Sequence, residues 1–226
     1  AKLDGKALDG ANFAGAFLDG SSFKGASLVG ANFSGATLSR ADFTGANLKG
    51  ANFSDANLGR AILKEVNLEG AKLDKAILDM AIFADAKLIG ASLKKTSFIR
   101  TSVINTDFSG ANLSGSKFMG IKLGMDAVAL LQKPQINPND FIDPIDFSGL
   151  DFTGANLSAA TLLGCEVKGS GKFANANLSK ATLIKCKFNN SNFSKSNFSG
   201  AKVALGAQFI RCNFEGANFE GAYFRG

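Results

Sequence analysis

The sequence predicts an all-β solenoid, a chain that turns a corner every five residues and stacks one coil on the next. Three observations lead to this fold class. Leu, Phe or Val occupies every fifth position from Leu3 to Leu123 without slippage. A small residue, usually Ala, stands two positions before most of these centres. Asn, Asp, Ser, Lys and Gly fill most of the other positions, as expected for turns and for a surface in water.

The period of five residues excludes a straight element. A helix face repeats near 3.6 residues and a strand face at 2, so either would spread the apolar centres around its whole surface. A coil with flat sides and tight turns keeps every centre inside, stacked on its counterpart in the next coil at the spacing of about 4.8 Å between neighbouring strands. Glycines two places after a centre, such as Gly35 and Gly45, mark the turns.

The pattern divides one continuous domain into three segments. Residues 1–123 form the first run of repeats, residues 124–146 interrupt it, and residues 147–226 resume it. Two longer steps, of six residues, follow Val167 and Val203, and we interpret each as a bulge at a corner.

Threonine replaces alanine at three successive small-residue positions, which are Thr96, Thr101 and Thr106. Buried hydroxyl groups need hydrogen-bond partners, so we expect backbone partners and slightly irregular coils here.

The pentapeptides resemble those of the pentapeptide-repeat family, whose consensus is A(D/N)LXX. The matching stretches include ADFTG at 41–45, ANLKG at 46–50, ANLSG at 111–115 and ANFEG at 217–221. This resemblance implies a right-handed quadrilateral parallel β-helix with four pentapeptides in each turn. The chain would then form about ten coils, in a rod on the order of 50 Å long.

The interruption contains all three prolines of the chain, Pro134, Pro138 and Pro144. Met125 to Gln132 has the apolar spacing of a short helix, and the following residues have the character of an extended, turn-rich loop. One interpretation is a packed connector that covers one side of the rod.

The other interpretation of the interruption is a partner-binding loop, because loops on rigid scaffolds commonly carry recognition. Its expected contacts are Asp140, Phe141, Ile142 and Asp143.

The composition argues against an enzyme. The chain has no histidine, which removes the commonest general base and metal ligand. The acidic residues that follow centres, such as Asp4, Asp74 and Asp79, are expected to be solvated decorations on a convex surface. Neither a catalytic site, a cofactor site nor a metal site is predicted.

Cysteine usage predicts buried free thiols. Cys165, Cys186 and Cys212 each stand two places before a centre, in the small inward position. At four pentapeptides per turn, Cys165 and Cys186 fall on the same face of successive coils and should touch. A disulfide between them stays open as the alternative.

The sequence therefore favours a non-enzymatic interaction module, a rigid rod that presents flat faces and one loop to a protein partner. The alternative comes from a branch of the family that mimics DNA, binds type II topoisomerases such as gyrase and protects against quinolones. Charge disfavours this alternative, since the net charge is +6 and is distributed as +4, −3 and +5 over the three segments. A nucleic-acid partner is also disfavoured, because the sequence contains no dense run of Lys and Arg.

The expected oligomeric state follows from the last coil. An uncovered coil exposes apolar centres and backbone groups, so Phe219 and Phe224 are predicted to pack end to end against a second copy or a further domain. We expect no membrane insertion, because no apolar run approaches the roughly 20 residues of a membrane helix. A cytoplasmic location is the expectation, with a processed lumenal or periplasmic form as the alternative.

Overall fold

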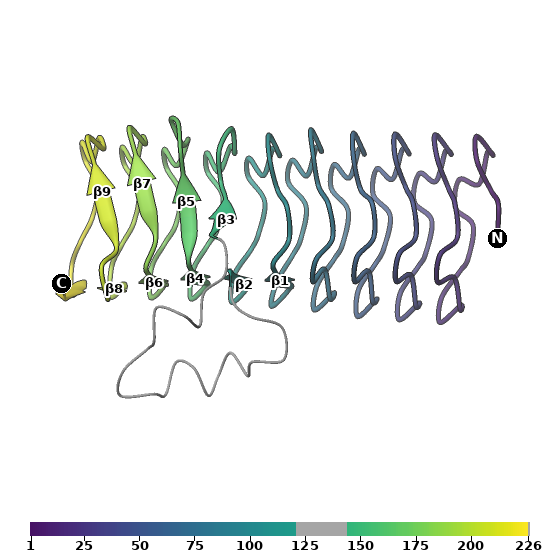
Figure 1. The fold of residues 1–226 in the computed structure, drawn as a ribbon, viewed down its shortest axis with the longest axis horizontal. Coiled ribbons are helices and arrows are strands. Elements are labelled where there is room, and N and C mark those ends of the chain that lie inside the picture. Colours follow the sequence, from purple (N-terminus) through teal and green to yellow (C-terminus); the bar gives the residue numbers. More distant parts are fainter. Residues whose placement is uncertain (121–143, 226) are drawn as a thin grey trace.

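A computed structural model describes residues 1–120 and 144–225 of the chain. These residues form one rod of stacked coils, with the N-terminus at one end and the C-terminus at the other (Figure 1). The predicted short helix at 125–132 lies outside the described residues, which themselves contain no helix.

Each pentapeptide ends in a tight turn that the sequence chemistry explains. After Leu8, for example, the Ala11 amide donates to the Leu8 carbonyl oxygen over 3.1 Å, and Gly10 has a φ of 67°. A positive φ at the third residue is the mark of a type II turn, and it favours glycine. Arg40 and Asp55 adopt the same conformation, with φ values of 60° and 59°.

Successive coils pair in parallel with an offset of 20 residues. One ladder of bridges joins positions 12, 32, 52, 72, 92 and 112 on one face, and it continues through 156, 177, 197 and 218. The all-β, parallel solenoid predicted from the sequence is therefore confirmed.

Ten short strands stand out where the pairing is longest. Six of them form one sheet in the order β1-β2-β4-β6-β8-β10 and four form a second sheet in the order β3-β5-β7-β9. The first sheet consists of β1 (Ser97–Ile99), β2 (Lys117–Met119), β4 (Thr161–Leu163), β6 (Thr182–Ile184), β8 (Lys202–Ala204) and β10 (Tyr223–Arg225). The second consists of β3 (Ile145–Asp146), β5 (Cys165–Val167), β7 (Lys187–Asn189) and β9 (Gln208–Ile210).

The two longer steps of the sequence pattern change the register by one residue. Thr161 of β4 pairs with Thr182 of β6, an offset of 21, whereas Thr182 pairs with Lys202 of β8 at the usual 20. The second extra residue restores an offset of 21 between Lys202 and Tyr223 of β10. Each step therefore inserts one residue without breaking the stack.

The interruption is inserted within a single coil. Lys117 of β2 pairs with Thr161 of β4, an offset of 44 residues in place of 20. The Asn105 amide donates to the Ser148 carbonyl oxygen over 3.3 Å, which places Phe147 in the coil above Val103. The position that five-residue counting assigns to Leu123 is thus taken by Phe147, and Leu123 itself lies outside the described residues.

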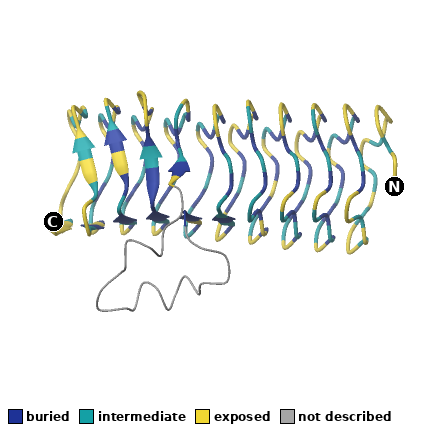
Figure 2. Cartoon of the chain, viewed as in Figure 1, coloured by how far each residue is buried: buried dark blue, intermediate teal, exposed yellow. Residues whose placement is uncertain are grey.

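The apolar centres form one continuous core along the rod, and Figure 2 shows that buried residues recur in successive coils. Phe33, Phe53 and Leu73, which are successive centres on one face, are at most 1% exposed. The rings of Phe33 and Phe53 stack with centroids 4.8 Å apart and planes 3° from parallel. This confirms that side chains spaced by five residues converge inside.

The buried threonines have the backbone partners that we expected. The Oγ1 atoms of Thr96 and Thr101 donate to the carbonyl oxygens of Leu73 and Leu78, both over 2.8 Å. The irregular coils expected here are not found, since Ile82 still bridges Ser102 at an offset of 20. A hydroxyl that bonds to the coil before it is compatible with regular stacking.

Candidate interaction surfaces

Of the two predicted sets of contact residues, only the pair near the C-terminus lies within the described residues. Residues 140–143 lie outside the described residues. Phe219 and Phe224 belong to the last described coil, where their side chains are 36% and 54% exposed. The structure therefore supplies geometry for the second set only.

Aromatic side chains continue the column into this last coil. The Phe219 ring stacks on Phe198 with centroids 5.1 Å apart, and the Phe224 ring lies 5.8 Å from Phe219. The strand β10 pairs with β8 on one side and with no other described strand. This end thus combines exposed apolar rings with an open strand edge.

The carboxylates that follow centres are more than surface decoration. Asp79 Oδ1 accepts hydrogen bonds from Ser97 Oγ over 2.6 Å and from the Ile99 amide over 3.1 Å, both in the next coil. Asp74 makes the same pair of contacts with Ser92 and Lys94. These aspartates therefore link successive coils, a role that the sequence analysis missed.

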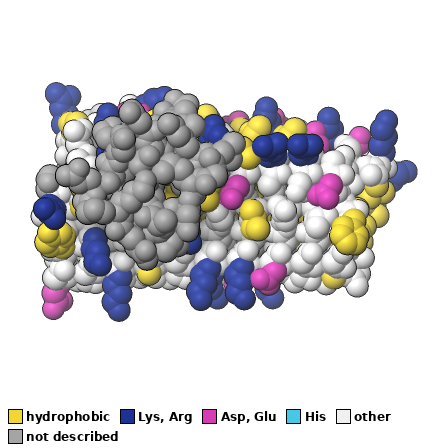
Figure 3. Space-filling view, turned by 60° about the horizontal axis from the view of Figure 1, so that its bottom comes forward, with side chains coloured by type: hydrophobic (Ala, Val, Ile, Leu, Met, Phe, Trp, Pro, Cys, Tyr) yellow, Lys and Arg dark blue, Asp and Glu magenta, His cyan; other side chains and the backbone are white. Residues whose placement is uncertain are grey.

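A sequence signal for these links exists once the coil length is known. A Ser or Thr stands 18 residues after the aspartate, as with Asp9 and Ser27 or Asp19 and Thr37. The remaining surface mixes both signs of charge, as Figure 3 shows for one side of the rod. In the described part of the chain, the aspartates that link coils lie on the surface, whereas a pair of catalytic carboxylates would lie together in a cleft.

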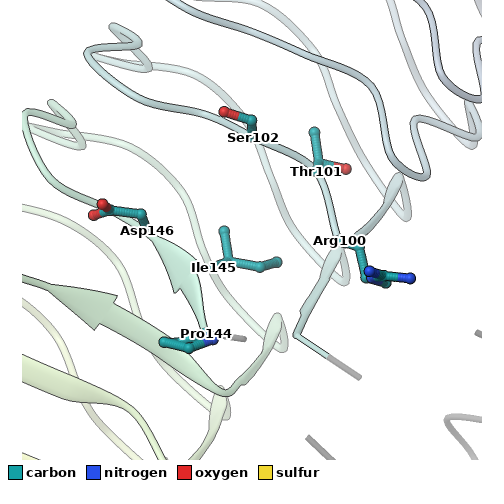
Figure 4. A pocket seen from close by; sticks show the side chains of 6 residues that line it. All are labelled: Arg100, Thr101, Ser102, Pro144, Ile145 and Asp146. Carbon is teal, nitrogen blue, oxygen red and sulfur yellow. The ribbon is translucent and has the colours of Figure 1, made fainter. Parts of the chain in front are cut away.

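A cavity of ≈ 270 Å³ adjoins the interruption. One side is formed by Arg100, Thr101 and Ser102, and the other by Pro144, Ile145 and Asp146 (Figure 4). The side chains of Arg100 and Asp146 point away from one another in this view, so they do not form an ion pair across the cavity.

Two polar groups of this cavity, those of Thr101 and Asp146, are engaged elsewhere. Thr101 donates to a backbone carbonyl group within the rod. The Asp146 carboxylate accepts a hydrogen bond from the Ser148 amide over 2.9 Å and lies 3.5 Å from Lys168 Nζ. Burial raises the pKa of Asp146, but these two partners outweigh it and hold the pKa below its usual value. Asp146 is therefore a weak base whose carboxylate is already engaged, which disfavours it for the activation of a hydroxyl nucleophile.

The three cysteines are free thiols, and the predicted burial holds for Cys165 and Cys186 but is incomplete for Cys212. Cys165 in β5 and Cys186, which directly precedes the paired strand β7, are fully buried, whereas Cys212 is partly exposed. Burial, followed by the neighbouring Cys186 thiol, raises the pKa of Cys165 well above its usual value. A protonated, buried thiol is a poor nucleophile.

The described residues contain neither a metal-binding cluster nor a membrane-spanning helix. No three His, Cys, Asp or Glu side chains gather where they could hold a metal ion. No helix among these residues has the length and hydropathy to cross a membrane.

Comparisons with known proteins agree with this geometry. A family model described as pentapeptide repeats matches residues 7–45, 41–79 and 81–120, and a second pentapeptide-repeat model matches residues 183–226. No catalytic family is indicated. A search of curated proteins found no match.

Several solved structures are similar. One is HetL of the cyanobacterium Nostoc sp. strain PCC 7120, a pentapeptide repeat protein involved in heterocyst differentiation regulation. It is 26% identical, with a TM-score of 0.63, over 98% of this chain and 86% of HetL. A pentapeptide repeat protein of the Arabidopsis thaliana thylakoid lumen is 33% identical over 48% of this chain and 69% of its own, with a TM-score of 0.33.

QnrB1, a plasmid-mediated fluoroquinolone resistance protein, is 19% identical over 98% of this chain and 90% of its own, with a TM-score of 0.37. Likeness at this level carries no functional argument. The periodic centres, the stacked coils and the matched family models lead to one conclusion: the chain belongs to the pentapeptide repeat family.

Proposed function

We propose that this chain is a non-enzymatic interaction module, in which a rigid rod holds residues that bind a protein partner. The observation that carries the proposal is the continuity of the coils on both sides of the interruption. The Gly120 amide donates to the Leu163 carbonyl oxygen over 2.9 Å, and the Ile145 amide donates to Gly164 over 2.8 Å. Both ends of the interruption are thus held on a rigid scaffold, the usual setting of a recognition loop.

The proposed contacts of this loop are Asp140, Phe141, Ile142 and Asp143. Two apolar side chains between two carboxylates can supply an anchor together with a polar rim, the usual composition of a protein interface.

The register allows a clean test. The offset of 44 exceeds the usual 20 by 24 residues, so deletion of residues 121–144 joins Gly120 to Ile145 and restores the five-residue spacing from Phe118 to Phe147. Affinity capture from source cells should recover a partner with the full chain and lose it with this deletion.

Point variants test the loop side chains without the deletion of the whole segment. Phe141→Ser and Ile142→Ser should also abolish capture, whereas Ile89→Ser, an exposed site on another edge, should not. Capture of the same partner by all of these variants would refute the role of the loop. A full chain that captures no partner at all would refute the interaction function.

We further propose that Phe219 and Phe224 mediate end-to-end association of two copies. The corners of the last coil carry Arg211, Glu215, Glu220 and Arg225, all exposed. A copy related by a two-fold axis can place each arginine over a glutamate while the exposed rings meet at the centre. Sedimentation should show a dimer that Phe224→Ser dissociates, and a monomer at high concentration would refute this contact.

DNA mimicry with gyrase binding is the alternative function. A mimic needs dense negative potential, whereas the chain carries a net charge of +6. Inhibition or quinolone protection in a gyrase supercoiling assay would favour the alternative and overturn this preference.

A further inference from the structure

One edge of the rod carries cationic and apolar side chains from successive coils. We call it the corner patch, and it consists of Arg40, Arg60, Ile62, Ile77, Met80 and Ile82. Figure 3 shows Lys and Arg side chains beside hydrophobic ones on the side of the rod nearer the N-terminus.

The turn positions of this edge concentrate arginine. Three of the five arginines of the chain, Arg40, Arg60 and Arg100, stand on this one column of turns, where Met80 occupies the coil between. Arg40 and Arg60 come from successive coils, so their Cα atoms are about 5 Å apart. Guanidinium groups bind carboxylates with two parallel hydrogen bonds, which a lysine cannot do.

Two carboxylates near this edge, those of Asp42 and Asp79, are already engaged. Asp42 lies 3.1 Å from Lys24 Nζ and accepts hydrogen bonds from Thr44, and Asp79 accepts its hydrogen bonds from the next coil. Within the described part of the chain, neither Arg40 nor Arg60 has an ion pair within 4.0 Å, and both side chains are exposed. The two guanidinium groups therefore remain available for an external anion.

The faces that meet at this edge carry unusual apolar residues. The outward position before each centre holds mostly Asn, Ser, Thr, Lys or Asp, yet here it holds Ile62, Ile77 and Ile82. Ile62 and Ile82 are bridged to one another in successive coils, and Ile77 is 44% exposed. Apolar side chains beside arginine and methionine are consistent with a protein interface, where arginine and methionine are enriched.

Hydrogen bonds between coils hold the backbone of this edge in place. The amides of Arg40, Arg60 and Met80 each donate to a carbonyl oxygen of the next coil, over 2.9, 2.9 and 2.8 Å. A backbone that is already ordered loses little conformational entropy when a partner binds.

We propose that the corner patch binds an acidic amphipathic segment of a protein partner. Carboxylates of that segment pair with Arg40 and Arg60, and an apolar side chain between them packs on Ile62, Ile77 and Ile82. This inference rests on the proposed interaction function and names the chemistry of the partner. A nucleic acid fits less well, because the apolar side chains of Ile62, Ile77 and Ile82 give a sugar-phosphate backbone no hydrogen-bond partner.

The test uses a short fluorescein-labelled peptide with a Leu-Phe pair flanked by glutamates, and the full chain. Binding measured by fluorescence anisotropy should weaken about tenfold or more in the double variant Arg40→Glu/Arg60→Glu. The double variant Ile62→Ser/Ile82→Ser should weaken it similarly.

The matched control is Lys75→Glu/Lys95→Glu, which reverses two exposed charges at the same turn position of successive coils on another edge. It should leave peptide binding unchanged, and all variants should keep the wild-type unfolding midpoint. No binding of the peptide, or equal weakening by the control, would overturn the proposal. Equal binding of a polyglutamate peptide, or tighter binding of single-stranded DNA, would overturn it as well.

Failure of this proposal can be told apart from failure of the interaction function. A partner captured from source cells by both the wild type and Arg40→Glu/Arg60→Glu would refute the corner patch and leave the interaction function standing.

Discussion

Replacement of Phe53 by alanine should be among the most destabilising single changes in the rod. Phe53 is fully buried, stacks on Phe33 and makes an edge-to-face contact with Phe43 at a centroid distance of 5.8 Å. Burial and cavity terms for Phe→Ala amount to about 3 to 5 kcal/mol. The two ring contacts are worth about 0.5 to 1.5 kcal/mol each beyond burial.

A leucine at this position separates the two contributions. The next coil already places Leu73 in the same column, so Phe53→Leu keeps most of the aliphatic packing and loses mainly the ring contacts. We therefore expect Phe53→Leu to cost about 1 to 3 kcal/mol, less than Phe53→Ala.

Guanidinium chloride unfolding followed by far-UV circular dichroism measures these differences. The control is Lys49→Ala, which removes an exposed ion pair with Glu69 at 3.2 Å and should cost under about 0.5 kcal/mol. Equal shifts of the unfolding midpoint for Phe53→Ala and Lys49→Ala would refute the assignment of inside and outside.

Three further predictions follow from the contacts between coils. Asp79→Ala should lower the free energy of unfolding by about 1 to 3 kcal/mol, since it removes two charge-assisted hydrogen bonds; no change in a denaturation series would contradict the link. Ellman's reagent should modify the native chain first at Cys212, and Cys165 should react only on unfolding; peptide mapping of the labelled thiols would reveal the opposite order. Burial raises the pKa of Asp151, but hydrogen bonds from Thr153 and Lys172 lower it below the usual 3.8. The unfolded chain therefore takes up the proton first, and the stabilisation by Asp151 should be present above about pH 4 and lost as the pH falls further. Acid unfolding of Asp151→Asn should show a weaker pH dependence, and an unchanged profile would contradict this account.

The axial column could be predicted because its periodicity is local. Each centre, such as Phe33, is identified by residues within the same pentapeptide, and no straight element tolerates that spacing. The buried thiols of Cys165 and Cys186 followed from the same positions. The links from Asp79 could not be predicted in this way, because their partners stand 18 or 20 residues later and become neighbours only when the coil length is known.

By itself the sequence determined which side chains face the axis, since a period of five residues leaves the backbone no other way to bury them. Only the tertiary structure decided that Phe147 takes the place above Val103. In the sequence, Leu123 and Phe147 satisfy the local pattern equally well. It also decided that Arg40, Arg60 and the outward isoleucines share one edge. Such surface groupings depend on the register of the stacked coils, and the register is set by backbone hydrogen bonds between residues far apart in the chain.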